Sequence, residues 1–489
     1  MNTLPKIQEL LIKSDASLIE AMRVIDRNAQ GIAFVVDADS RLVGVLTDGD
    51  VRRALLNGAT LTMPASQVMR TRFISRPAET DNKELVSLLN DQIRHIPLVD
   101  KENRPVDYVC IHHLRRIQVM EPVLDGNELE YVSDCIKTNW ISSQGKYVRQ
   151  FEDSFSAYCS MPYGLAVSNG TVAIHLALEA LGVGPGDEVI VPDLTFAATI
   201  NAVLYARATP VIVDISPVTW NIDPKQVEKA VTKKTKAIIP VHLYGQACQM
   251  DELLEIAARH KLFIVEDCAE AIGTKYKGRP VGSFGDVSTF SFFGNKTITT
   301  GEGGMLLFKD KKLFERASIL RDHGMSKQIK YWHDEVGYNY RMTNMQAAIG
   351  VAQMERVNNF VEQKQRLGAL YDGFFAKAVN ITTPARTSSS SNSYWLYTIL
   401  LNTASGIARD ELIKKMLMNG IETRPVFFPL HKMPPYAQFA SGGGFPTACD
   451  VSARGISLPS SVFIKKEEVE GICKVLLSIL ETRSIVDRV

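Results

Sequence analysis

Short apolar runs alternate with longer amphipathic stretches through the middle of this chain. Four of the runs are typical of buried strands: 188–191, 210–214, 237–242 and 262–267. Between them lie helical patterns such as 251–259, which places Leu253, Ile256 and Ala257 on one face. Because strands alternate with helices, the pattern predicts an α/β fold with a mostly parallel central sheet and helices on both of its faces.

The first 118 residues contain an internal repeat. The segment 32–37 recurs as 95–100 (95 − 32 = 63), and 51–53 recurs as 114–116 at the same offset (114 − 51 = 63). Each copy predicts helix, strand, turn, strand, helix. Since neither copy could cover its own sheet face, we expect the two to pack together.

The rest of the chain is expected to form two further domains, 119–375 and 376–489. The run of serines at 387–392 predicts a flexible connection, and the apolar run 394–401 follows it. A length of 489 residues fits this division into domains.

Composition and charge restrict the class of protein. A net charge of +1, with 22% charged residues, implies no strong attraction to nucleic acid or membrane. Seven cysteines without a CxxC pair predict neither a disulfide framework nor a zinc or other metal site. Charged residues occupy 1–9, where a signal peptide needs an apolar core, and no apolar run reaches the ~20 residues of a membrane span. We therefore expect a cytoplasmic protein.

Lys296 carries the most informative chemistry. The strand pattern 287–293 delivers it into a glycine-rich turn, and a second strand pattern, 304–308, leads away. A lysine at the end of a buried strand loses solvation, which lowers its pKa. The deprotonated amine can attack an aldehyde, so this is the environment of a Schiff-base lysine. The alternative is an ordinary solvated loop lysine.

One acid, Asp267, ends the strand pattern 262–267, and a second, Glu270, follows it. Asp267 would stand at the carboxyl end of the sheet, where α/β folds bind ligands. A carboxylate there can keep a pyridine nitrogen protonated. Glu270, three residues later, could reach the 3-oxygen of the same ring. Taken alone, Asp267 could equally be a helix cap.

A phosphate site is predicted upstream. The segment 165–171 leads into an apolar helix pattern, 172–181, and free N–H groups at that helix start would bind a phosphate. Thr171 and Ser291 can add hydroxyl donors, and Phe196 could cover a ring face. Thr171 as an N-cap and Phe196 as simple core are the alternatives. Together with Lys296, these residues predict a pyridoxal-phosphate site.

From about residue 118 to near the C-terminus, the chain resembles the DegT/DnrJ/EryC1/StrS family of nucleotide-sugar aminotransferases, and seven motifs carry the resemblance. They are the segments 139–146, 166–171, 184–192, 239–245, 266–271, 291–304 and 337–342. The resemblance implies an aspartate-aminotransferase-like fold of type I with a small C-terminal domain, and pyridoxal 5′-phosphate as cofactor.

The same resemblance implies a role for each site residue. Lys296 would carry the cofactor and act as acid and base, Asp267 would pair with the ring nitrogen, and Glu270 with the ring hydroxyl. Phe196 would stack on the ring. The phosphate would be bound by Gly170, Thr171 and Ser291, with Asn339 reaching it from a neighbouring subunit. A homodimer with shared active sites is therefore implied.

The implied reaction moves an amino group from glutamate to the C4 keto group of a nucleotide-linked 4-keto-6-deoxy sugar, for surface polysaccharide biosynthesis. Within the family, three segments resemble members that act on a GDP-linked sugar. They are the residues around Lys296, Tyr331-Trp332 and 422–429. Alternatives are a UDP- or dTDP-linked sugar, a sugar dehydratase, or a nucleotide-sensing regulator with a vestigial fold. The dehydratase branch has histidine where this chain has Lys296.

Residues 1–118 resemble a tandem pair of CBS domains. In the first copy, Thr47 and Asp50 match the threonine and aspartate that hold a nucleotide in that family. In the second copy, Cys110 and His113 occupy the equivalent positions. The resemblance implies at most one regulatory nucleotide site, and a purely structural appendage is the alternative.

Overall fold

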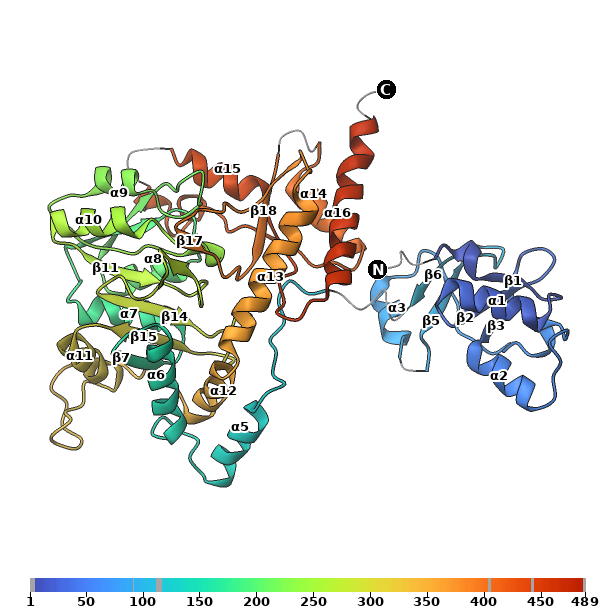
Figure 1. Cartoon of the computed structure of the whole chain (residues 1–489), viewed down its shortest axis with the longest axis horizontal. Helices are drawn as coiled ribbons and strands as arrows, with labels where there is room; N and C mark the ends of the chain where they lie inside the picture. Colours follow the sequence, from blue (N-terminus) through green and yellow to red (C-terminus); the bar gives the residue numbers. More distant parts are fainter. Residues whose placement is uncertain (1–4, 91, 111–116, 403–405, 441–443, 487–489) are drawn as a thin grey trace. The chain divides into compact units, whose positions relative to one another are not determined.

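The computed structural model describes the whole chain except residues 1–4, 91, 111–116, 403–405, 441–443 and 487–489 (Figure 1). The chain divides into two compact units, Met1–Arg116 and Ile117–Val489. Each unit is built around hydrophobic cores of its own.

The smaller unit contains two three-stranded sheets, each with one parallel and one antiparallel pair: β1-β2-β3 and β4-β5-β6. Its helices and strands are η1 (Ile7–Leu10), β1 (Leu11–Lys13), α1 (Leu18–Asn28), β2 (Ile32–Val36), β3 (Leu42–Thr47), α2 (Asp48–Leu56), η2 (Ala65–Gln67), β4 (Arg76–Pro77), α3 (Asn82–Leu88), β5 (His95–Val99) and β6 (Pro105–Cys110).

The strand register confirms the predicted repeat. Ile32 pairs with Thr47 in the first copy, and His95 pairs with Cys110 in the second, so both partners shift by 63 positions (95 − 32 = 110 − 47 = 63). The copies also share a core, in which the rings of Phe34 and Tyr108 lie 5.9 Å apart, edge to face. Of the predicted equivalences, His113 and 114–116 lie outside the described residues.

A seven-stranded sheet organises the larger unit in the order β7-β15-β14-β11-β10-β8-β9. All neighbouring pairs are parallel except the two that involve β15, which confirms the predicted mostly parallel sheet. The strands are β7 (Tyr163–Val167), β8 (Glu188–Pro192), β9 (Thr209–Val213), β10 (Thr235–Ile238), β11 (Phe263–Asp267), β14 (Val287–Ser291) and β15 (Gly304–Phe308).

Strand direction sets where ligands can bind. Since β15 is antiparallel to both β14 and β7, these two strands run the same way as β11, β10, β8 and β9. The carboxyl ends of β7, β8, β11 and β14 therefore meet at one edge of the sheet, which is where ligands bind in folds of this class.

Helices connect and cover these strands. They are α5 (Glu128–Lys137), α6 (Lys146–Tyr158), α7 (Gly170–Ala180), α8 (Ala198–Tyr205), α9 (Pro224–Ala230), η3 (Leu243–Gly245), α10 (Met250–His260), α11 (Lys311–Arg321) and α12 (Asn344–Met354). Residues Leu253, Ile256 and Ala257 of α10 are buried, as their spacing predicts. The apolar helix α7 packs against β14 and β15.

A second, smaller core lies at the C-terminal end of the chain, around an antiparallel sheet of order β16-β18-β20-β19. Its elements are β16 (Ile381–Thr382), β18 (Tyr397–Leu401), α14 (Arg409–Met418), β19 (Arg424–Pro425), β20 (Gly455–Leu458) and α16 (Lys466–Val486). Three further elements of this part of the chain pack into the core of the large sheet instead: η5 (Leu430–Lys432), η6 (Ala437–Phe439) and α15 (Pro446–Arg454).

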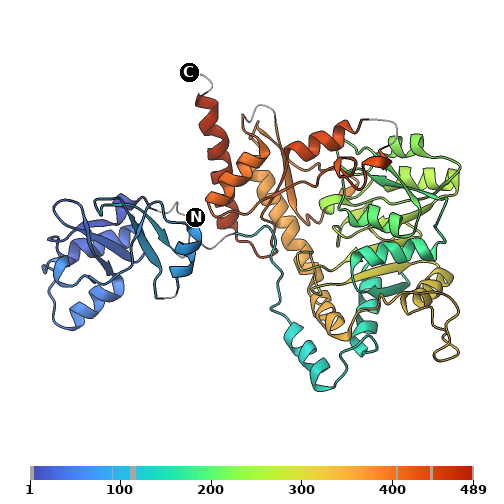
Figure 2. The same ribbon diagram turned by 180° about the vertical axis from the view of Figure 1, so that it is seen from behind.

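The long helix α13 (Val357–Phe375) runs from α12 towards α14 and α16, as both views show (Figures 1 and 2). Its first half packs into the core of the large sheet, and its second half, with Leu367 and Tyr371, into the smaller core. Both cores share this helix, and the division into domains at residue 375 stays a prediction.

One expectation is wrong. The serine-rich segment 387–392 was expected to be a flexible connection, but Ser390–Ser391 forms β17, which pairs with β12 (Lys275–Tyr276) next to β13 (Arg279–Pro280). Serine can occupy this strand because the pairing is formed by backbone N–H and C=O groups, whatever the side chain. None of the helices in the described part of the chain combines the length and apolarity that a membrane-spanning segment needs.

Candidate active site

Three strands bring the predicted cofactor residues to one edge of the sheet. Ser291 at the end of β14 pairs with Gly304 of β15, which pairs with Val167 at the end of β7. The segment after β7 therefore begins beside the end of β14. Asp267 ends β11, the next strand, opposite Thr289 of β14.

Lys296 lies in the turn after β14, with its side chain 12% exposed. Its Nζ is 3.8 Å from Glu270 Oε1 and 3.7 Å from the centroid of the Trp395 ring. Burial lowers the pKa of Lys296, while the charges of Glu270 and Asp267 oppose that shift. The prediction of a desolvated lysine is thus matched by its surroundings, and the solvated-loop alternative is wrong.

Asp267 is buried, and both of its carboxylate oxygens accept hydrogen bonds. Oδ2 accepts from the hydroxyl of Thr199 at 2.9 Å, and Oδ1 accepts from the N–H of Ala269 at 3.1 Å. Burial raises the pKa of Asp267, and these two hydrogen bonds oppose the rise by favouring the carboxylate. Asp267 ends a strand and starts no helix, so the helix-cap alternative is wrong.

Glu270 is also buried, and it forms the ion pair with Lys296 Nζ. Its Oε2 accepts from the N–H of Tyr244 at 2.9 Å. Burial raises the pKa of Glu270 to about 7, although the charge of Lys296 opposes the rise. Around neutral pH this carboxyl can therefore either donate or accept a hydrogen bond.

Helix α7 begins against Ser291. A Cβ atom on Gly170 would lie 2.8 Å from Ser291 Cβ, so only glycine allows this approach. Asn169 is the N-cap and accepts from the N–H of Val172 at 3.0 Å, so the alternative of Thr171 as N-cap is wrong. The N–H groups of Gly170 and Thr171 precede the first intrahelical hydrogen bond, and with the Ser291 hydroxyl they form a donor set that fits a phosphate.

An aromatic wall borders the same edge. Phe196 is 60% exposed, which excludes the simple-core alternative, and its ring lies 5.9 Å from that of Phe427. Tyr244 stacks on Phe427 at 5.5 Å and on Trp395 at 6.0 Å. The wall thus continues from Phe196 to the tryptophan beneath the amine of Lys296.

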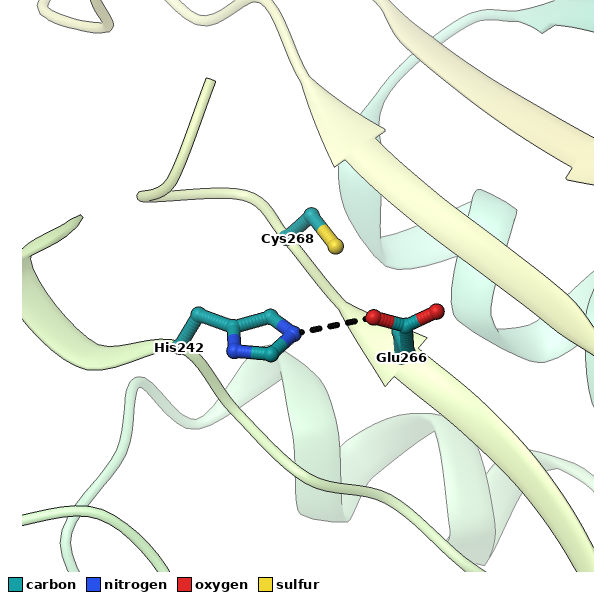
Figure 3. Close-up of side chains that lie close together, drawn as sticks. All are labelled: His242, Glu266 and Cys268. Carbon is teal, nitrogen blue, oxygen red and sulfur yellow. Dashed lines mark hydrogen bonds and ion pairs between the residues drawn. The ribbon is translucent and has the colours of Figure 1, made fainter. Parts of the chain in front are cut away.

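A buried histidine, glutamate and cysteine lie close together: His242, and the two residues on either side of Asp267 in the sequence, Glu266 and Cys268 (Figure 3). Their nearest ligand atoms lie within 4.8 Å of one another, a spacing that could suit a metal ion. However, His242 Nδ1 accepts from the N–H of Cys248 at 3.0 Å, so its Nε2–H is directed at Glu266 Oε2, 3.1 Å away. The carboxylate also accepts backbone N–H groups of Gly282, Phe284 and Gly285.

These hydrogen bonds give Glu266 a structural role, because they hold the strand that carries Asp267. Burial would raise the pKa of Glu266, but hydrogen bonds from His242 and the backbone outweigh it and lower the pKa. The oxygens that a metal would need are occupied by these donors. Burial raises the pKa of the Cys268 thiol well above its ordinary value, so this thiol is a poor nucleophile and a poor metal ligand.

Asn339 lies near the end of β7 in its own chain, because the carbonyl of the adjacent Tyr340 accepts the N–H of Ser168 at 2.8 Å. It is exposed, and its Oδ1 accepts from Nε and Nη2 of Arg341, at 3.2 and 3.0 Å. Its neighbours Tyr338 and Tyr340 stack on each other at 4.7 Å, which fixes the backbone on either side. The predicted role of Asn339 in a partner's site stays a prediction.

Thr47 and Asp50 lie together in the smaller unit. Thr47 is the N-cap of α2, and its hydroxyl donates to Asp50 Oδ2 at 2.6 Å. Asp50 Oδ1 accepts from Arg53 at 2.6 Å and Arg70 at 2.7 Å. Burial would raise the pKa of Asp50, but hydrogen bonds from Thr47, Arg70 and Arg53 outweigh it and lower the pKa. A nucleotide site at these residues stays a prediction.

Two contacts of the site were missed from the sequence. Trp395 follows Lys296 by 99 positions (395 − 296 = 99), and no local pattern distinguishes it from a core tryptophan. Thr199 lies early in α8, 68 positions before Asp267 (267 − 199 = 68). Its only signal is its nearness to Phe196, already singled out, after a neighbouring strand.

Residues 122–477 match the profile of the DegT/DnrJ/EryC1/StrS aminotransferase family, and 7–57 and 65–119 each match that of the CBS domain. The predicted CBS pair is thereby confirmed. A curated relative, GDP-perosamine synthase of Caulobacter vibrioides, is 47% identical over 75% of this chain and 99% of its own length. GDP-perosamine synthase of Escherichia coli O157:H7 is 47% identical over 74% of this chain and 98% of its own.

Solved structures resemble the larger unit. DesV of S. venezuelae has a TM-score of 0.69 at 34% identity and covers 73% of this chain and 94% of its own. Spr1654 of Streptococcus pneumoniae, solved in its PLP form, has a TM-score of 0.71 at 30% identity, with 75% and 99% covered. The predicted aspartate-aminotransferase-like fold is confirmed by these similarities.

Proposed function

Because the chain belongs to the DegT/DnrJ/EryC1/StrS aminotransferase family, we propose that it uses pyridoxal phosphate to move an amino group from glutamate to the C4 keto group of a GDP-linked 4-keto-6-deoxy sugar. The observation that carries the chemistry is the amine of Lys296, desolvated and 3.8 Å from Glu270, at the strand edge that ends in Asp267. The product would be an amino sugar for surface polysaccharides.

The hydrogen-bond donors at the start of α7 and at Ser291 suit the phosphate of the cofactor. Gly170, Thr171 and Ser291 would hold its phosphate, and Phe196 would cover its ring. When bound, pyridoxal phosphate supplies an aldehyde carbon and an electron-accepting ring. Asp267 would hold a proton on the ring nitrogen, because a carboxylate held by Thr199 and Ala269 favours a neighbouring positive charge. Glu270 would share a proton with the ring hydroxyl.

Lys296 would move the proton of the reaction. Burial lowers its pKa, which favours the neutral amine that is needed to accept a proton at Nζ. The acids beside it stabilise the protonated amine, from which the proton is returned. Trp395 below Nζ excludes water from one side of the amine and attracts its charged form.

The nucleotide is assigned from the relatives. GDP-perosamine synthases from three organisms are 44–47% identical to this chain, whereas a UDP-sugar 3-aminotransferase of Acidithiobacillus ferrooxidans is 36% identical. This difference favours GDP over UDP in the substrate. The lysine at position 296 favours amino transfer over dehydration.

The test is a panel of GDP-, UDP- and dTDP-4-keto-6-deoxy sugars, each incubated with glutamate and the purified full-length protein and followed by mass spectrometry. We expect an amino sugar from the GDP substrate, with glutamate consumed in equal amount, and none with Lys296→Ala. Turnover of the UDP or dTDP sugar alone would reassign the nucleotide. Loss of water without glutamate consumption would indicate a dehydratase, and no turnover at all would favour a regulator.

A further inference from the structure

Outside the cofactor site, an aspartate, a histidine and a cysteine lie in a line. Asp193 directly follows β8, His431 belongs to η5, and Cys449 lies in α15. His431 Nδ1 is 2.7 Å from Asp193 Oδ2, and His431 Nε2 is 3.8 Å from Cys449 Sγ. A nucleophile, a base within reach of it and a third group that orients the base form the arrangement of an activated nucleophile.

The hydrogen bonds fix the state of the histidine. Asp193 is fully buried, and its carboxylate accepts both the backbone N–H of His431, at 2.9 Å, and the ring. A carboxylate accepts hydrogen bonds, so His431 Nδ1 carries the proton and the lone pair of Nε2 faces Cys449. Stacking on Phe445, with ring centroids 4.6 Å apart, holds the imidazole plane.

Cys449 differs from the other six cysteines, because they are all buried and it is partly exposed. Burial raises the thiol pKa of Cys135, Cys159, Cys248, Cys268 and Cys473, which makes them poor nucleophiles. The N-terminus of α15 does not activate Cys449, because the N–H groups of Thr447 and Ala448 already donate to the carboxylate of Asp214. Activation therefore falls to His431.

We propose that Cys449 is a reactive thiol, activated by His431 and Asp193, that is modified by hydrogen peroxide or by thiol-directed electrophiles. With peroxide, His431 Nε2 takes the S–H proton and the sulfur attacks one peroxide oxygen. The S–O bond forms and the O–O bond breaks. The departing hydroxide takes the proton from the imidazolium as water. Sulfur is oxidised by two electrons to sulfenic acid, and peroxide is reduced.

The modification is connected to the active site through the backbone. The N–H of Leu430 donates to the carbonyl of Asp193 at 2.8 Å, so the segment that carries His431 is fixed to the loop that leads to Phe196. The same segment includes Phe427, which touches Phe196. An adduct on Cys449 needs the space in front of the His431 ring, so it displaces this segment and slows turnover.

The test treats the full-length holoenzyme at pH 7 with limiting iodoacetamide, or with peroxide and dimedone, and maps the labelled peptides by mass spectrometry. Cys449 should be labelled first, with turnover falling in step, and Cys449→Ser should keep activity and resist inactivation. His431→Asn retains a donor for Asp193 but has no base, so labelling should slow at least about tenfold. Cys135→Ser is the matched control and should change nothing.

A pH profile of the labelling rate distinguishes loss of thiol activation from small structural changes in the variants. In the wild type the labelling rate should persist to lower pH than in His431→Asn, because only the wild type has a base beside the thiol. Labelling of another cysteine first, or equal rates with and without His431, would overturn the proposal. Labelling of Cys449 without loss of turnover would overturn its connection to the active site.

Discussion

The carboxylate of Asp267 accepts hydrogen bonds on both oxygens and lies at the end of a strand. Since asparagine keeps the shape of aspartate and removes its charge, a substitution can test the charge. We expect Asp267→Asn to keep cofactor binding but to shift the absorbance of the cofactor and to lower turnover by about 10²-fold or more. Thr199→Val, which removes one supporting hydroxyl, should have a smaller effect of the same kind. Unchanged rate and spectrum in Asp267→Asn would contradict the role given to this acid.

Glu270 predicts a pH dependence of stability. Its pKa in the folded protein, about 7, is above its ordinary value, so its favourable contribution is complete below about pH 4 and is lost as the pH rises through 7. Between pH 5 and 8, cofactor-free wild type should therefore lose roughly 1–3 kcal/mol of unfolding free energy relative to Glu270→Gln. Urea unfolding at each pH measures this difference.

Lys296 provides the control for that experiment. Its charge favours the carboxylate of Glu270, so the pH-dependent difference should be larger in a Lys296→Ala background. A difference that does not change with pH in either background would mean that the carboxyl titrates normally.

Single residues also show the limit of what the sequence can predict. Lys296, Asp267 and Ser291 follow strand patterns, and the strand direction then brings them together. Trp395 and Thr199 reach the same place from distant segments through packing alone, and a core tryptophan and a helical threonine have no pattern of their own. Contacts of this kind depend on the tertiary fold, which local periodicity does not encode.

At the scale of elements, α7 makes the sharpest prediction. Alanine favours a helix over glycine by about 1 kcal/mol, but at Gly170 its Cβ would lie 2.8 Å from Ser291 Cβ. Gly170→Ala should therefore weaken cofactor binding, because the helix start must move away from β14. Gly373→Ala in α13 is the control, since nothing lies within 4 Å of its Cβ position. Equal cofactor affinity in both variants, measured by absorbance titration, would contradict the close approach.

The ends of strands can be predicted from the apolar pattern where the strand pairs regularly along its whole length. The pattern 304–308 coincides with β15, and 287–293 loses only two residues to become β14. By contrast, the pattern 237–242 ends early, because β10 stops at Ile238. Pro240 lacks an N–H and cannot continue the ladder. Beyond it, Val241 forms an isolated bridge with Asp267, which a hydrophobic pattern does not distinguish from a continuous strand.

At the scale of the whole molecule, the exposed Asn339 predicts complementation between subunits. A mixture of Lys296→Ala and Asn339→Ala proteins should regain activity, because a hybrid dimer would contain one intact site. Lys296→Ala mixed with Asp267→Asn should regain none, since both defects come from the same side of each site. No recovery in the first mixture, with subunit exchange shown by mass spectrometry, would mean that each site is built from one chain.

The larger unit should function alone if it is cut at the right residue. Two curated relatives match over 99% and 98% of their own length, but the matches cover only 75% and 74% of this chain. Ile117 exchanges backbone hydrogen bonds with Gly420 and Glu422, so the truncated protein should begin at Ile117 rather than after it. We expect its turnover, in the absence of nucleotide, to be within about twofold of the full-length enzyme. A large loss would show that the CBS pair supports the catalytic unit directly.

Regulation by the CBS pair is tested by titrating adenine and guanine nucleotides against both forms. If a nucleotide binds at Thr47 and Asp50, it should bind the full-length form only and change its kinetics, by a coupling of ~1–3 kcal/mol. Asp50→Ala should remove both effects, and Asp48→Ala, on the exposed side of the same helix start, should remove neither. Absence of binding to either form would leave the pair a structural appendage.

The order of the central sheet has a further consequence, for synthesis of the chain. Strand β7 pairs only with β15 among the described strands, and 137 positions separate the end of one from the start of the other (304 − 167 = 137). At ~5–20 residues per second, β7 emerges from the ribosome roughly 7–27 s before its partner exists. During that time a row of backbone donors and acceptors on an apolar strand is open to other nascent chains. Slow translation of 168–303 should therefore increase aggregation, and cofactor capture can begin only after β15 has been inserted.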